Sequence, residues 1–167
     1  ADQKARMDAL LYGSSYEAAL RAARRLGSDQ VALARARIAV SRRASNAKAL
    51  LDDVRRLGLE RGDQRLVREA QAEQVRDLAR SSQVDEAIEL GQAVLAAADA
   101  DEQWTQARTL SGLGLAEGTR PGGDRQRAAA WLIEAAGLFR LLGADNEEAG
   151  VLIWLGYSVQ FASGEVD

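Results

Sequence analysis

A helical pattern that recurs along the chain is the feature that most limits what it can fold into. Three segments open alike, each with an acidic and polar pair ahead of a helical run: DQVALARARIAV from residue 29, DQRLVREAQAEQV from 63 and DEQWTQARTLSGL from 101. A fourth opening, NEEAGVLIWLG, starts at residue 146, so the spacings are 34, 38 and 45 residues. This recurrence indicates a repeat architecture, in which each unit buries its apolar face only by stacking on its neighbours.

The third and fourth openings also share an internal motif. The pattern Ala-x-x-Leu-x-x-Leu-Gly starts at Ala107 in one and, 42 residues later, at Ala149 in the other. Between the openings lie four further helical runs, and three of them end in a basic turn followed by Gly27, Gly58 or Gly143. Such an ending is a helix stop signal, so these glycines are predicted to be C-caps.

Composition agrees with a helical chain. Of the 167 residues 47% are hydrophobic, one is Pro, and Ala, Leu, Arg and Glu, which are strong helix formers, predominate. No segment alternates in the manner of a strand. We therefore predict an all-α protein of about nine helices, at approximately 2–12, 15–26, 29–44, 46–57, 64–80, 83–98, 102–117, 125–142 and 147–162.

The helix expected at 83–98 is unusually rich in small residues. Ser82 and Asp85 have the spacing of a capping box, and Ala87, Gly91 and Val94 share one helical face. A face of small residues lets a neighbouring helix approach closely. We therefore expect Gly91→Leu to overpack the contact and to lower stability by about 1–3 kcal/mol.

The repeat length and several short motifs resemble tetratricopeptide (TPR) and TPR-like repeats. The resemblance rests on Tyr-Glu-Ala-Ala-Leu from Tyr16, Asp-Glu-Ala-Ile from Asp85 and the Leu-Gly pairs of the opening helices, and it extends over essentially the whole chain. The sequence departs from the family in its longer spacings, in lacking a Pro between repeats, and in the long loop at 117–124. Its longer repeats look like those in sensory regions of bacterial transcription regulators and signalling ATPases.

The resemblance implies antiparallel helix pairs stacked as a right-handed TPR-like solenoid, forming one domain over residues 1–167. The approximate repeats are 1–28, 29–62, 63–100, 101–145 and an incomplete 146–167. Because Val166 and Asp167 repeat the Val84 and Asp85 that open a helix, the sequence stops where another helix is expected to start. We therefore expect this chain to be an excised piece of a longer protein.

Residues able to carry out catalysis are few. The chain has no His and no Cys, so it lacks the commonest general bases, nucleophiles and transition-metal ligands, and we predict no enzyme activity. The glycines at 112, 114 and 118 do not have the spacing of a dinucleotide fingerprint and are interpreted as helix contacts. The acidic cluster at Asp99, Asp101 and Glu102 lacks the spacing of a calcium loop. No cofactor and no metal are predicted.

Aromatic and basic residues supply the remaining candidates. The favoured interpretation places Trp104, Trp131 and Trp154 in the core, with a ligand-stacking role as the alternative. For the basic run RARIAVSRR from residue 35 a solvated face is favoured over an anion-binding surface. A pI near 5.2 and the absence of aromatic residues among the arginines argue against nucleic acid. With no signal peptide and no apolar run long enough for a membrane span, the predicted location is cytoplasmic.

The resemblance implies a non-catalytic module that binds a protein or peptide in a regulatory or scaffolding role. Helical position suggests these groove residues: Arg35, Arg42, Arg76, Arg108, Ser111, Ile153 and Tyr157. An alternative is self-assembly, because residues 1–84 carry a net charge of +6 and residues 85–167 one of −9. Such stacking, or pairing of solenoid ends, would give a homo-oligomer. A second alternative is a region that senses a small effector between helices.

Overall fold

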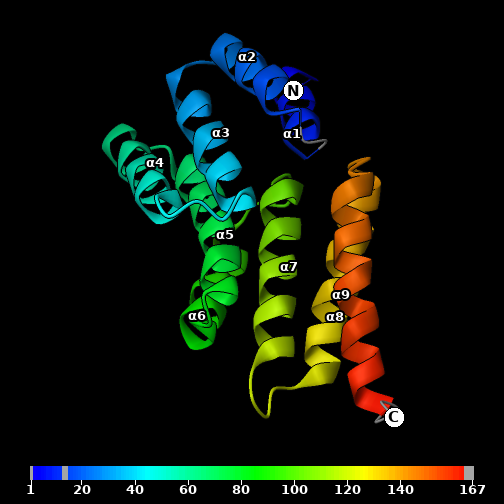
Figure 1. Cartoon of the computed structure of the whole chain (residues 1–167). Helices are drawn as coiled ribbons and strands as arrows, with labels where there is room; N and C mark the ends of the chain where they lie inside the picture. The colour runs from blue at the N-terminus through cyan, green and yellow to red at the C-terminus, as the bar shows by residue number, and fades with distance from the viewer. Residues whose placement is uncertain (1, 13–14, 164–167) are drawn as a thin grey trace. The chain divides into compact units, whose positions relative to one another are not determined.

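The computed structural model describes residues 2–12 and 15–163 (Figure 1). Within these residues it contains nine helices and no strand, which confirms the all-α prediction. None of the helices in this part of the chain is both long and apolar enough to cross a bilayer. The helices are α1 (Asp2–Tyr12), α2 (Tyr16–Leu26), α3 (Ser28–Ser41), α4 (Ala47–Arg61), α5 (Gln64–Arg80), α6 (Val84–Ala97), α7 (Gln103–Thr119), α8 (Arg125–Leu141) and α9 (Asp145–Ser163).

Of the three predicted C-caps, Gly27 of α2 is confirmed and Gly143 is one residue late, because Leu142 is the C-cap of α8. The expected C-cap at Gly58 is wrong. Helix α4 continues to Arg61 and is capped by Gly62, whose φ of 69° is the left-handed conformation that glycine adopts easily. Gly58 is small for another reason: a Cβ there would lie 2.8 Å from Val67 Cγ2, so the glycine admits the start of α5.

The start of α6 also differs from the prediction. The expected capping box at Ser82 and Asp85 is wrong, because Ser82 lies in the preceding turn with a φ of 62° and the helix is entered through Gln83. The side-chain nitrogen Nε2 of Gln83 lies 3.1 Å from Glu86 Oε1. Asp85 pairs instead with Arg120, with 2.8 Å between Oδ1 and Nη2. The apolar half of the prediction is confirmed, because Ala87, Gly91 and Val94 are all buried.

The chain divides into two compact units, residues 1–74 and residues 75–167, with the boundary inside α5. We call them the N-terminal unit and the C-terminal unit. In the N-terminal unit α1 packs on α2 and α3, and α3 packs on α4. One apolar cluster joins α1, α2 and α3 around Met7, and a second joins α3, α4 and the first turns of α5 around Leu33 and Leu51.

A buried ion cluster adds to these apolar contacts. Arg37 on α3, only 3% exposed, places Nη1 2.7 Å from Asp8 Oδ1 of α1 and Nε 3.2 Å from Glu73 Oε1 of α5. Lys4 Nζ lies 2.8 Å from Glu69 Oε1, and both Glu69 and Glu73 are buried. We call Asp8, Arg37, Glu69 and Glu73 the Arg37 cluster. The predicted solvated face of the basic run is therefore wrong for Arg37, although Arg35, Arg42 and Arg43 are exposed.

The C-terminal unit is built on close contacts at glycines. Helices α7, α8 and α9 lie side by side, with α6 on the other side of α7 (Figure 1). A Cβ at Gly91 of α6 would lie 2.6 Å from Leu113 of α7, and one at Gly114 of α7 would lie 2.5 Å from Leu132 of α8. A Cβ at Gly112 would lie 2.8 Å from Val75. The interpretation as helix contacts is therefore confirmed for Gly112 and Gly114.

Candidate functional site

Two cavities lie next to each other between α7 and α9 in the C-terminal unit. The larger has a volume of about 470 Å³ and is lined by Leu115, Gly118, Arg125, Leu132, Trp154 and Tyr157, among others. The smaller, of about 60 Å³, shares Leu115 and Trp154 with it and adds Arg76, Ser111 and Glu147. We call the two together the α7–α9 groove.

Small residues on α7 and large rings on α9 shape the larger cavity. Gly114 and Gly118 are one turn apart on α7, and neither contributes a side chain to fill the space. From α9, Trp154 and Tyr157 line the cavity with ring centroids 6.1 Å apart and planes inclined by 56°. Trp154 is 43% exposed and Tyr157 52% exposed, so the core position predicted for Trp154 is wrong.

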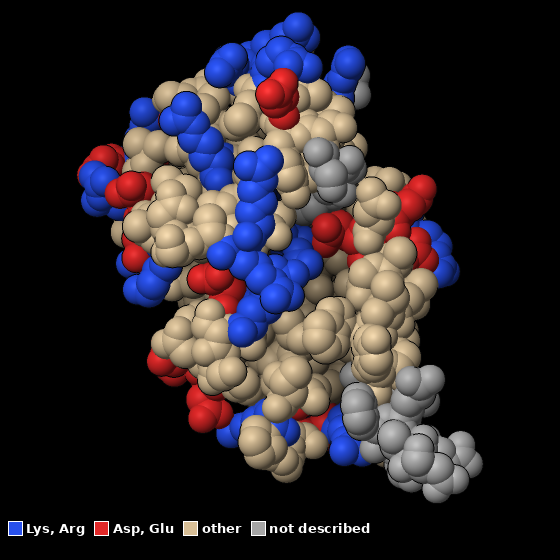
Figure 2. Space-filling view, in the orientation of Figure 1, with Lys and Arg blue, Asp and Glu red and all other residues tan. Residues whose placement is uncertain are grey.

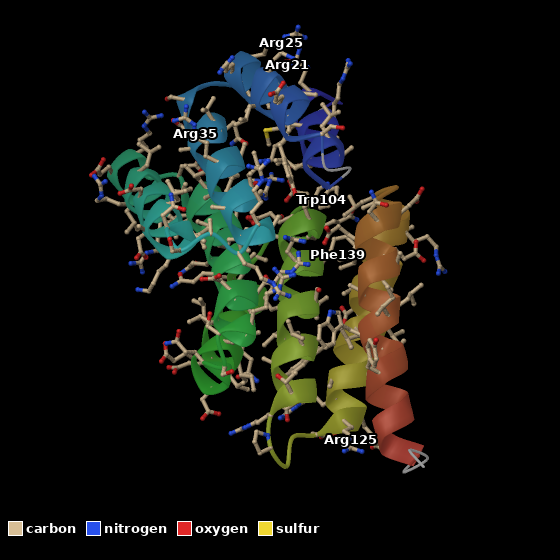
Figure 3. The ribbon with its side chains drawn as sticks, viewed as in Figure 1. Arg21, Arg25, Arg35, Trp104, Arg125 and Phe139 are labelled. Carbon is tan, nitrogen blue, oxygen red and sulfur yellow. The ribbon has the colours of Figure 1, made fainter. Side chains whose placement is uncertain are left out.

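The other two tryptophans agree better with the predicted core. Trp104 at the start of α7 packs against Phe139 near the end of α8, with ring centroids 5.9 Å apart at 62° (Figure 3). Trp131 is partly buried against the same apolar cluster, and the Arg127 guanidinium carbon lies 5.4 Å from its ring centroid. Among the three, Trp154 alone lines the groove.

The smaller cavity is bordered by charged side chains. Glu147 at the start of α9 pairs with Arg108, which is only 1% exposed, and its Oε2 lies 3.5 Å from Nη1 of Arg76. Two guanidinium groups, those of Arg76 and Arg108, therefore meet the Glu147 carboxylate at this end of the groove. Arg108 itself is too deeply buried to meet a ligand and acts by holding Glu147.

A closed loop sets the position of the opposite rim. Glu117 Oε1 at the end of α7 accepts hydrogen bonds from the Asp124 backbone N–H and from Arg127 Nη2, both at 2.7 Å. Asp124 in turn accepts from the Arg127 backbone N–H at 3.0 Å and so caps α8. Burial of Glu117 opposes its ionisation, but these donors outweigh it and hold the pKa of its carboxyl below the ordinary value. The loop therefore fixes Arg125 at the rim, where Figure 3 labels it at the beginning of α8.

The structure brings together part of the predicted set of binding residues. Arg76, Ser111 and Tyr157 line the groove and Arg108 supports it. Ile153 is 60% exposed on α9 but does not line either cavity.

The remaining two predicted residues lie on the N-terminal unit. Arg35 is exposed on α3 (Figure 3), and the Arg42 guanidinium carbon lies 4.8 Å from the ring centroid of Tyr16. A separate cavity of this unit, of about 340 Å³, is lined by Arg6, Leu10, Arg21 and Arg25, among others. Lys and Arg side chains gather over α1 and α2 in Figure 2.

Sequence reasoning missed Arg125 and Gly118 as groove residues, and it gave a ligand-stacking role for Trp154 only as the alternative to the core. A signal was present, because Trp154 stands three residues before Tyr157 and so shares its helical face, and Gly118 follows Gly114 by one turn. Within the described residues, no group of three or more His, Cys, Asp or Glu side chains is arranged to hold a metal ion. The groove is suited to holding an apolar side chain together with a negatively charged group.

Comparison with known proteins adds no assignment: no protein family, no curated protein and no solved structure matches this chain.

Proposed function

We propose that the chain is a non-catalytic, TPR-like binding module that holds a short segment of a partner protein in the α7–α9 groove, in a regulatory or scaffolding role. The observation that carries the proposal is the 470 Å³ cavity with two half-exposed aromatic rings and an arginine at its rim. Cavities of roughly 300–1,000 Å³ are typical of binding sites, and exposed Trp and Tyr are the side chains that most often dominate binding energy.

In this proposal the helix pairs are antiparallel and stack as a right-handed solenoid. Contacts within the pair α7 and α8 support the antiparallel part. Trp104 at the start of α7 meets Phe139 near the end of α8, and Gly114 late in α7 meets Leu132 early in α8. The groove then lies on the face lined by α7 and α9, which are alternate helices of the stack.

The chemistry of the groove defines the segment that fits it. Leu115, Leu132 and the rings of α9 favour one large apolar side chain in the larger cavity. Arg125 at the rim and Arg76 in the smaller cavity favour acidic groups on either side of it. The preferred ligand is therefore an acidic peptide with a Leu, Met or aromatic anchor.

Selection from a random 12-residue phage-displayed peptide library on the intact chain tests this proposal. We expect the selected peptides to combine a large apolar residue with neighbouring Asp or Glu, and their affinity to fall at least tenfold on Trp154→Ala. Arg125→Glu should weaken the same peptides severalfold through repulsion. The control is Ile133→Ala, which removes an exposed apolar side chain from α8 outside the groove. Peptides that bind Trp154→Ala as well as they bind the original chain would overturn the proposal.

Self-assembly is a second candidate, supported by the basic cavity of the N-terminal unit. Arg6, Arg21 and Arg25 offer a docking point for acidic residues, and residues 85–167 carry a net charge of −9. Light scattering on a sizing column separates the two candidates. Assembly driven by charge predicts species larger than 18.0 kDa that dissociate as salt is raised, whereas a monomer at both salt concentrations excludes it.

A further inference from the structure

Helix α9 carries an uncovered copy of the surface that α7 uses to hold α8. The motif that begins at Ala107 in α7 is repeated from Ala149 in α9, 42 residues later. In α7 the first two motif positions, Ala107 and Leu110, are buried in the cluster shared with α8. In α9 the matching Ala149 is exposed and Leu152 is 44% exposed.

The third motif position shows that the two helices are used in the same register. Leu113 of α7 fills the space at Gly91 of α6, the helix that precedes α7. The matching Leu155 of α9 packs against the cluster containing Leu132 and Phe139 of α8, the helix that precedes α9. Each helix therefore turns the same side toward its predecessor, and the two differ on the side where a following helix packs.

The glycine at the end of the motif marks that side. At Gly114 a Cβ would lie 2.5 Å from Leu132 Cγ and 3.2 Å from the Ala128 carbonyl oxygen, so α8 inserts a leucine there and brings its backbone close. At Gly156 no described atom lies within 4 Å of the corresponding Cβ position. Ala149, Leu152, Ile153 and Gly156 follow the i, i+3, i+4, i+7 spacing of one helical stripe. We call these four residues the α9 outer face.

We propose that the α9 outer face docks an amphipathic helix of a partner protein that carries the pattern of α8. That pattern is a small residue, a Leu four residues later and a small residue three further on, as at Ala128, Leu132 and Ala135, all buried on α7. The partner's Leu enters the space at Gly156, as Leu132 does at Gly114.

The charge at the start of α9 and the burial of α8 limit further which helix can dock on this face. Asp145 lies one turn before Ala149 on the same stripe of α9 and is exposed. A docked helix antiparallel to α9 brings its own last turn beside Asp145, so an Arg or Lys in that turn supplies the opposite charge. A second copy of the chain does not offer this helix, because Ala128, Leu132 and Ala135 are buried within the C-terminal unit.

The experiment uses a fluorescein-labelled peptide of residues 124–143 as the probe and fluorescence polarisation against the intact chain. We expect saturable binding that falls at least tenfold on Gly156→Leu, which fills the space, and on Leu152→Glu, which places a charge in the apolar contact. Because both positions are exposed, the variants should keep the original circular dichroism spectrum and Tm. A peptide carrying Leu132→Asp should not bind.

Two controls separate this surface from the groove. Trp154→Ala should leave peptide affinity unchanged, because Trp154 belongs to the α7–α9 groove and not to the α9 outer face. Ile133→Glu should also leave it unchanged. Binding that is absent, or that survives both Gly156→Leu and Leu152→Glu, would overturn the proposal. So would a dimer of the original chain that Gly156→Leu dissociates, because the face would then belong to a second copy.

Discussion

In the N-terminal unit three helices meet around the charged side chain of Arg37, whereas in the C-terminal unit α7 meets α8 at a glycine. Arg37 contacts carboxylates from α1 and α5 and is buried with them. Gly114 has no side chain at all, and its place is taken by Leu132. The first contact depends on the charge of a side chain, and the second depends on the absence of a side chain.

The two kinds of contact fail for different reasons. A buried ion cluster is sensitive to the loss of any one partner, because the charges that remain are buried away from water and have lost a counter-charge. A contact at glycine is sensitive to addition, because the packed neighbours have no room to move aside. The stability of the N-terminal unit should therefore fall most when a charged side chain is removed. That of the C-terminal unit should fall most when a larger side chain replaces a glycine.

Arg37→Met should have the largest effect. It leaves Asp8, Glu69 and Glu73 buried without their shared cation, and breaking a buried ion pair in this way costs roughly 3–5 kcal/mol. Urea unfolding followed by circular dichroism measures the loss. All three tryptophans, at 104, 131 and 154, lie in the C-terminal unit, so tryptophan fluorescence reports that unit separately.

The matched control is Arg35→Met, two residues earlier on α3 and exposed. A change within about 0.5 kcal/mol is expected there. If Arg37→Met were as mild as Arg35→Met, the Arg37 cluster would have no part in stability.

Filling a glycine contact should have the next largest effect. Gly91→Leu and Gly114→Leu each place side-chain atoms where Leu113 or Leu132 already lies, and overpacking of this kind costs about 1–3 kcal/mol. The tryptophan-monitored unfolding midpoint should fall in both variants. Gly137→Leu on α8 is the control, because nothing lies within 4 Å of its Cβ position and leucine is the better helix former. Equal effects at Gly91 and Gly137 would refute the close-packing account.

The sequence predicted the helices and their apolar faces far better than it predicted which charged side chains are buried. Helical periodicity is local, so it located the nine helices of the described residues and the face of Ala87, Gly91 and Val94. Arg37 could not be distinguished from Arg35 in this way, because its partner Asp8 lies 29 residues away. Glycine was similarly ambiguous: Gly58 has the local signal of a C-cap, but its contact with Val67 determines its role.

The groove was predicted only in part for the same reason. Helical position placed Ser111 and Tyr157 on the faces that line it. Whether Trp154 fills a core or borders a cavity depends on which residues stand opposite on α7 and α8, and there Leu115, Gly118 and Leu132 line a cavity. That information lies in the packing of α7 against α9 and not in either helix alone.

Removing the cap of α8 should have a moderate effect that the N-terminal unit does not share. Asp124→Ala deletes the acceptor for the Arg127 backbone N–H and should cost about 1 kcal/mol. Asn46→Ala is the control, because Asn46 occupies the N-cap position of α4 without a side-chain cap hydrogen bond. Urea unfolding of both variants makes the comparison. A loss at Asn46 as large as the loss at Asp124 would contradict the assigned cap.

The two units should also differ in how pH changes their stability. As pH falls, the contribution of Asp8 to stability should rise and that of Glu117 should fall. Burial raises the pKa of the Asp8 carboxyl, and the positive charges of Arg37 and Lys4 oppose this shift only in part. The contribution of Asp8 to stability is therefore fully present below the unfolded pKa and is lost as pH rises through the folded pKa. The pKa of Glu117 is lowered, because the Asp124 N–H and Arg127 outweigh burial, so its contribution is present above the unfolded pKa and is lost as pH falls through the folded pKa.

Unfolding free energies from about pH 7 to about pH 3, a range that brackets the ordinary carboxyl pKa near 4, measure both contributions. Relative to Asp8→Asn the original chain should gain stability as pH falls, and relative to Glu117→Gln it should lose stability. Slopes of the same sign would show that one of the two carboxylates is not held as its neighbours indicate.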